Sequence, residues 1–160
     1  TNEKLFAPAN GFFIFVAVIE TYKIEIYGED ENQIQRMEEV IAPLQDISNY
    51  FWKLLWIDGE SETDEYSVFE LQEVIDQQDG IMVEYDQLES LCYKMETVTE
   101  ALIIGDRKEN NLYVNIEDEN LYDNEVVFEF VRDSHWQILT SDMNIVDVFK
   151  VFFPNSKIIE

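Results

Sequence analysis

Hydrophobic and polar residues alternate along several short segments of the chain, which is the pattern of half-buried β-strands. In the segment 22–27, for example, Lys23 and Glu25 alternate with Ile24 and Ile26. Together with a high content of β-branched and aromatic residues, this alternation predicts strands at 12–19, 22–27, 50–57, 81–85, 101–104, 112–116, 126–131 and 136–140. The last four would form an antiparallel meander, because residues typical of turns separate them.

Apolar residues three or four positions apart predict helices in other segments. Asp30 and Ser67 each begin a capping-box pattern, with Gln or Glu three residues later. Three of these helical patterns stop at a residue that ends helices: Pro43, Gly80 and Pro154. The helices predicted in this way are 30–43, 67–78, 86–95 and one that follows a cap at Ser141 or Asp142.

The order of these elements predicts an α+β fold, with a mostly antiparallel sheet and three to four helices. The chain has 160 residues, of which 46% are hydrophobic and 14% aromatic, so a sizeable core can form. No Gly/Ser-rich or Pro-rich run marks a linker. We therefore expect residues 1–160 to form a single domain.

Charge adds a further constraint, because 35 acidic residues stand against 10 basic ones and the formal net charge is −25. No Lys or Arg occurs at 54–93 or at 109–131. Charge of one sign at this density repels itself and attracts cationic partners. It argues against a nucleic-acid partner, since no basic stripe exists to displace phosphate counterions. The alternative is that the acids only form a solvated surface.

Membrane association and metal binding have little support in the sequence. The longest apolar run, 11–19, is far shorter than the roughly 20 residues of a membrane-spanning helix, so no membrane partner is expected. The acidic segment 58–65 has no glycine at the sixth position of an EF-hand calcium-binding loop and no glutamate at the end of such a loop. One cysteine and one histidine disfavour zinc. We expect neither a metal site nor a cofactor.

Nucleophilic catalysis also has few candidate residues. His135 is the only histidine and Cys92 the only thiol, and they fall in different predicted elements. Ser134 precedes His135, but neighbours on a strand point to opposite faces, so no catalytic pair is expected. A single cysteine cannot form a disulfide within this sequence, which fits a reducing compartment, and we expect a cytoplasmic location. The leading interpretation is that the protein is not an enzyme.

Carboxylates are the most obvious candidates for contact with a basic partner. The residues we expect at such an interface are Asp58, Glu60, Glu62, Asp64 and Glu65, with Glu117, Asp118, Glu119 and Asp123 as a second patch. Trp52 and Trp56 lie four apart in a predicted strand and would share one face of it. That face is either packed in the core or exposed as an interface anchor.

The segment 128–153 resembles the strand–turn–strand–helix ending of several small bacterial toxin-immunity proteins. The similar features are the turn 132–134, Trp136 on the next strand, the cap at Ser141 or Asp142 and a short apolar helix. The resemblance implies a cytoplasmic protein that binds and blocks the catalytic domain of a cognate toxin. Since immunity proteins do not share one fold, it implies nothing about the fold.

The leading hypothesis is therefore an acidic inhibitor of a basic protein, in particular an immunity protein against a nuclease-type toxin. Two alternatives stay open. One is a carboxylate-dependent enzyme such as a glycoside hydrolase, which needs two carboxyl groups close together, one with a raised pKa. The other is a subunit of a larger assembly that associates through the faces of Trp52, Trp56, Phe12, Phe13 and Phe15.

Overall fold

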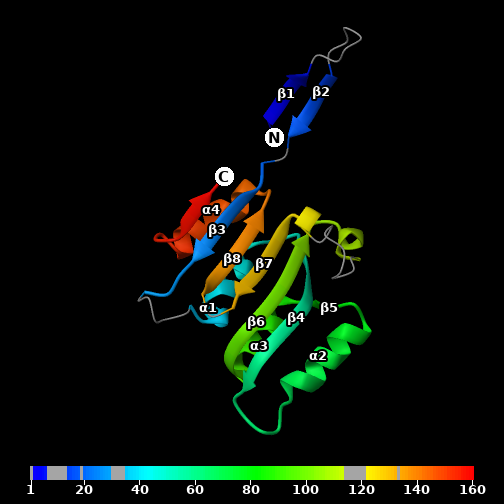
Figure 1. Ribbon diagram of the computed structural model, residues 1–160, viewed down its shortest axis with the longest axis vertical. Coiled ribbons are helices and arrows are strands. Elements are labelled where there is room, and N and C mark those ends of the chain that lie inside the picture. Colours follow the sequence, from blue (N-terminus) through cyan, green and yellow to red (C-terminus); the bar gives the residue numbers. More distant parts are fainter. Residues whose placement is uncertain (1, 7–13, 19, 30–34, 114–121, 133) are drawn as a thin grey trace.

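Seven antiparallel strands form the central sheet, in the order β5-β4-β6-β7-β8-β3-β9 (Figure 1). The computed structural model describes residues 2–6, 14–18, 20–29, 35–113, 122–132 and 134–160. The strands are β3 (Tyr22–Ile26), β4 (Phe51–Ser61), β5 (Ile81–Val83), β6 (Met95–Asp106), β7 (Val126–Val131), β8 (His135–Thr140) and β9 (Lys157–Ile159). The α-helices of this part of the chain are α1 (Met37–Ile41), α2 (Val68–Gln77), α3 (Tyr85–Lys94) and α4 (Met143–Phe152). The predicted α+β fold is confirmed.

The core lies between one face of the sheet and helices α1, α3 and α4, which cover that face (Figure 1). A row of paired residues crosses it from strand to strand: Leu54, Ile103, Phe128, Ile138 and Ile24. All five side chains in this row are fully buried. Removing this much apolar surface from water is the main force that holds the helices on the sheet.

The opposite face of the sheet carries a smaller apolar cluster, formed by Leu55, Ile104, Leu112 and Val127. Leu112 belongs to the short 3-10 helix η2 (Glu109–Leu112), which packs against β4 and β6. The buried amine of Lys53 lies at the same place and donates to the Leu112 carbonyl oxygen at 2.9 Å. Burial lowers the pKa of this amine.

Local capping signals in the sequence predicted three helix boundaries correctly. The Ser67 hydroxyl accepts a hydrogen bond from the Glu70 amide at the start of α2. The Asp142 carboxylate accepts one from the Asn144 amide at the start of α4. Helix α2 ends before Asp79 and Gly80, which both have positive φ.

Helix α1 is shorter than predicted. It begins at Met37, because Arg36 has extended backbone dihedrals and acts as the N-cap. The expected cap at Asp30 lies outside the described residues. After Ile41 the chain continues as the 3-10 helix η1 (Ala42–Asp46), with a proline in its first turn. The sequence predicted that the helix ends at Pro43, but the chain continues there as a 3-10 helix instead of an α-helix.

Strands β4 and β6 are longer than predicted and form one paired ribbon. Asp58 and Gly59 were expected to begin a loop, but β4 continues through them to Ser61. Three register shifts allow this. Gly59 has φ +154°, and a Cβ atom there would lie 2.0 Å from the Thr97 carbonyl oxygen, so no other residue fits without movement.

Strands at three other places also differ from the sequence prediction. Leu112 closes η2 and Tyr113 lies in no strand, and the rest of the strand predicted at 112–116 lies outside the described residues. Strand β9 was not predicted; it pairs with β3 at one edge of the sheet, as β5 pairs with β4 at the other. Both edge strands have only three residues. β1 (Asn2–Phe6), also not predicted, and β2 (Ile14–Val18) form a separate two-stranded sheet.

Candidate functional site

The first predicted acidic patch lies together at one end of the β4–β6 ribbon. Two of its residues are on β4 and three are in the loop to α2, and the β6 residue Glu96 joins them. We name this surface the acidic ribbon end; it consists of Asp58, Glu60, Glu62, Asp64, Glu65 and Glu96. All six side chains are exposed, and none takes part in an ion pair among the described residues. The ribbon end therefore presents uncompensated negative charge.

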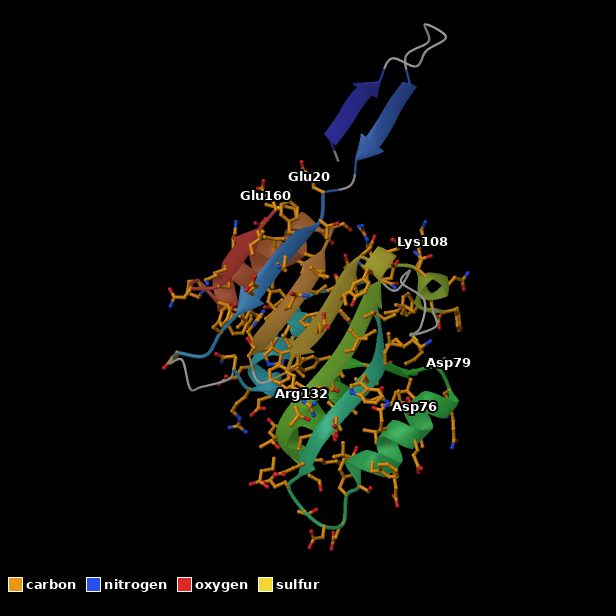
Figure 2. All side chains as sticks on the ribbon, viewed as in Figure 1. Glu20, Asp76, Asp79, Lys108, Arg132 and Glu160 are labelled. Carbon is orange, nitrogen blue, oxygen red and sulfur yellow. The ribbon has the colours of Figure 1, made fainter. Side chains whose placement is uncertain are left out.

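Two cations nearby are already engaged. Arg132 projects from the β7–β8 turn over the face of the sheet that the helices leave uncovered, where it pairs with Glu100 at 3.4 Å (Figure 2). The Lys94 amine lies 5.0 Å from the centre of the Tyr66 ring. Asp58 and Glu100 are direct cross-strand partners, so two carboxylates stand opposite each other. Arg132 pairs with Glu100 and not with Asp58, so the charge of Glu100 alone is compensated.

The two tryptophans do not share a face, and this prediction was wrong. The register shift between Leu54 and Trp56 inserts one residue, so Trp52 pairs with Gly105 and Trp56 with Leu102. Trp52 is 5% exposed and packs edge-on against a core phenylalanine. Trp56 lies half-buried on the opposite face, where its indole Nε1 donates to Glu100. Trp52 is thus a core residue, and Trp56 is held beside a carboxylate.

Of the second predicted patch, Glu117, Asp118 and Glu119 lie outside the described residues, and Asp123 is exposed. Asp106 links the segment before 114–121 to the segment after it, and its side chain is 1% exposed. Its carboxylate accepts hydrogen bonds from the Lys108 amide at 2.9 Å, the Asn111 side-chain amide at 3.1 Å and the Glu125 amide at 3.3 Å. The buried carboxylate therefore joins η2 to the start of β7.

An ion pair reinforces this junction. The Arg107 guanidinium donates from Nε and Nη2 to the Glu125 carboxylate over 2.7–3.0 Å and lies 6.0 Å from the centre of the Tyr50 ring. Hydrogen bonding to Arg107 lowers the pKa of Glu125. The Tyr50 hydroxyl donates to Asp142 at 2.5 Å, and burial, followed by that carboxylate, raises the pKa of the tyrosine. Tyr50 thus connects the pair to the cap of α4.

A second acidic surface was not predicted. A cleft of about 900 Å³ opens between η1, the start of β4, the end of β5 and the start of α3. We name it the acidic-aromatic cleft. Its aromatic lining residues are Tyr50, Phe51, Trp52 and Tyr85, and its carboxylates are Glu84, Asp86, Glu89 and Glu109. No Lys or Arg is among the described residues that line it.

The polar groups of the cleft are held by neutral donors. The Tyr85 hydroxyl accepts a hydrogen bond from the Gln45 side chain at 2.5 Å and donates to Glu89 at 3.4 Å. Burial raises the pKa of Tyr85, so it stays a neutral hydroxyl. The Phe51 ring is 44% exposed at the rim. The cleft thus offers aromatic faces beside carboxylates that no described cation neutralises.

One signal in the sequence could have indicated the cleft. The segment 84–89 reads Glu-Tyr-Asp-Gln-Leu-Glu and places an aromatic residue between acids at a helix start. Its partners Phe51 and Glu109 come from distant parts of the chain. No local pattern shows that these segments meet.

The predicted separation of Ser134 and His135 was wrong. Ser134 lies in the turn before β8 and not on the strand, so its hydroxyl can reach the imidazole, and Oγ lies 2.7 Å from Nδ1. The other ring nitrogen, Nε2, is 3.6 Å from a Glu25 oxygen, and Tyr27 stacks on the ring at 4.6 Å. The pKa of Glu25 is lowered, first by the hydrogen bond from Tyr27. Neither Ser134 nor His135 lines the cleft.

The single thiol is placed as the sequence indicated. Cys92 lies on the buried face of α3, where its side chain is 4% exposed. Burial raises the pKa of the thiol to about 12. Since the thiolate is the reactive form, this residue is a core residue with little nucleophilic character.

The comparisons with protein-family models, characterised proteins and solved structures found no match to this chain. Among the described helices, none has the length and apolar character required to cross a bilayer. The two acidic surfaces are therefore the features of the molecule that bear on its function.

Proposed function

We propose that the chain is an acidic binding protein that neutralises a basic protein partner, in the manner of an immunity protein that blocks a nuclease-type toxin. The observation that supports this most is the acidic-aromatic cleft. Tight binding needs desolvated aromatic anchors at the centre of an interface, and charge alone contributes little affinity. The described residues that line the cleft combine exposed aromatic surface with four carboxylates and include no Lys or Arg.

The acidic ribbon end would have a different role in the same reaction. Its six exposed carboxylates lie on the β4–β6 ribbon and the loop that follows, at the other end of β4 from Phe51 in the cleft. Charges at the rim of an interface mainly speed the encounter with an oppositely charged partner and contribute less to the lifetime of the complex. We therefore assign steering to the ribbon end and anchoring to the cleft.

A carboxylate-dependent enzyme has less support. A glycoside hydrolase needs a carboxyl group with a raised pKa as its general acid. Glu25 and Glu125 are shifted in the opposite direction, because hydrogen-bond donors hold each of them in the ionised form. Neither residue lines the cleft, where substrate could bind.

The test is capture from a native lysate on the immobilised chain at low salt, followed by purification of the captured protein and assay of its activity. We expect a basic enzyme that the chain inhibits at one-to-one stoichiometry. The association rate should fall at least about ten-fold between 20 and 300 mM salt, because attraction between exposed charges is screened. Inhibition that needs a large excess of the chain, or an association rate independent of salt, would contradict the proposal.

Two sets of variants separate the two roles. Neutralising Glu60, Glu62 and Asp64 should lower the association rate with little effect on dissociation. Phe51→Ala should raise the dissociation rate instead. Asp147→Asn removes one charge from the exposed side of α4 and serves as the control, with both rates expected to stay near those of the unmodified chain.

A further inference from the structure

The chain carries one arginine whose surroundings show how a guanidinium is held in this fold. Arg107 makes a two-nitrogen contact with the Glu125 carboxylate and lies over the Tyr50 ring. Three lysines also lie over tyrosine rings, at 5.0–5.6 Å. Among the described cations, only Arg107 combines a tyrosine face with such a carboxylate contact.

At Tyr85 the acidic-aromatic cleft repeats this combination of groups, and no Lys or Arg is among the described residues that line the cleft. Tyr85 contributes its ring, and its hydroxyl is hydrogen-bonded to the carboxylate of Glu89. Phe51 adds a second ring at the rim, and Glu84 and Glu109 add further carboxylates. A tyrosine beside a glutamate is thus found at two neighbouring places. Arg107 occupies the first, over the Tyr50 ring that also lines the cleft, and the second, at Tyr85 and Glu89, lies where the cleft opens to solvent.

From this we infer that the cleft binds an arginine side chain presented by the basic partner, in preference to a lysine. Charge complementarity requires a cation, because the described lining of the cleft contains four carboxylates and no base. A guanidinium is more weakly hydrated than an ammonium, stacks on aromatic rings and pairs with carboxylates through two nitrogens. The half-buried rings of Tyr50 and Tyr85 and the exposed ring of Phe51 therefore favour arginine. The inference rests on the proposed function for the source of that arginine.

The probes for this site are the blocked tripeptides Ac-Gly-Arg-Gly-NH₂, Ac-Gly-Lys-Gly-NH₂ and the same peptide with citrulline, which has the shape of arginine but no charge. Each is titrated into the ¹⁵N-labelled chain at low salt and followed by NMR. We expect saturable shifts at the amides of Phe51, Glu84 and Tyr85 with the arginine peptide. The lysine peptide should bind roughly five-fold more weakly, and citrulline should give no saturable shift.

Variants of the cleft identify the groups responsible. Phe51→Ala removes an exposed ring and Glu89→Gln removes a charge with little change of shape, and each should weaken the arginine peptide about two- to five-fold. Glu73→Gln makes the same chemical change at an exposed position of α2, outside both acidic surfaces, and should leave the affinity unchanged. Circular dichroism of each variant shows whether the fold is kept.

The outcomes distinguish this inference from the proposed function. Equal affinity for lysine and arginine, or an equal loss of affinity in Glu73→Gln and Glu89→Gln, overturns the arginine site even if a basic partner is captured and inhibited. Arginine binding in the cleft without any inhibited partner supports the site and overturns the proposed function.

Discussion

Replacing Asp106 by Asn should destabilise the fold, although it removes one negative charge from a chain with a net charge of −25. One carboxylate oxygen of Asp106 accepts from the Lys108 amide and the Asn111 side chain, and the other accepts from the Glu125 amide. Every one of these partners is a donor. Whichever way the new side-chain amide is oriented, its NH₂ group faces an N–H group.

The magnitude follows from the hydrogen bonds that are lost. A hydrogen bond to an ionised group contributes about 1.5–3 kcal/mol, and a buried donor left without an acceptor costs a similar amount. Relief of repulsion from the other acids acts in the other direction, but those exposed charges are screened by solvent and salt, so this effect is the smaller one. We therefore expect a loss of about 2 kcal/mol, which for 160 residues lowers the Tm by roughly 4–8 °C.

The assay is urea denaturation followed by tryptophan fluorescence, together with a thermal melt. Asp147→Asn is the matched control, because it makes the same substitution at an exposed position of α4 and should change the free energy of unfolding by less than about 0.5 kcal/mol. If Asp106→Asn is as stable as the unmodified chain, or more stable, then charge repulsion outweighs the hydrogen bonds and the reasoning is refuted.

Three further predictions concern the core, the ion pair and the net charge. Gly105→Ala would place a Cβ atom 2.3 Å from the Trp52 ring, so we expect a loss of about 1–3 kcal/mol and altered tryptophan fluorescence, and an unchanged spectrum would contradict this. Hydrogen bonding to Arg107 lowers the pKa of Glu125, so the ionised Glu125 stabilises the fold. This stabilisation is complete above the pKa of the unfolded chain, about 4.3, and is lost as the pH falls through the lowered pKa of the folded protein. Glu125→Gln should therefore reduce the loss of stability at acid pH, measured by urea melts at a series of pH values. Raising NaCl from 20 mM to about 0.5 M should raise the Tm by screening self-repulsion, and a lower Tm would argue against it.

The parts of the fold that the sequence predicted are those fixed by local interactions. The caps at Ser67 and Asp142 were predicted because a capping side chain bonds an amide two or three residues away. Strand β7, at 126–131, was predicted to the residue, because this segment is rich in β-branched and aromatic residues and residues typical of a turn follow it at 132–134. The hairpin β7-β8 follows from the turn residues at 132–134, but the meander was predicted with a further strand at 112–116 between β6 and β7, whereas β6 pairs directly with β7.

The parts that were missed depend on contacts between distant residues. Asp58 and Gly59 resemble the start of a turn, yet pairing with β6 keeps them in a strand. The bulge after Leu54 has no signature in the sequence, and it alone places Trp56 on the other face from Trp52. The cleft is lined by segments between residues 44 and 109. Hydrophobic periodicity could predict the helices and strands that these segments form, but not that the segments contact one another.

The length of the strands at the two edges of the seven-stranded sheet has a consequence for the protein at high concentration. An exposed strand edge can recruit another chain through its free backbone amides, which is how many sheets polymerise. Here β5 and β9 have three residues each, and beyond β5 helix α2 packs against β4, where the Gln72 side chain accepts from the Ile57 amide, so either margin offers a foreign strand few hydrogen bonds. Such margins would let many copies accumulate in a crowded cell without growing into fibres through this sheet.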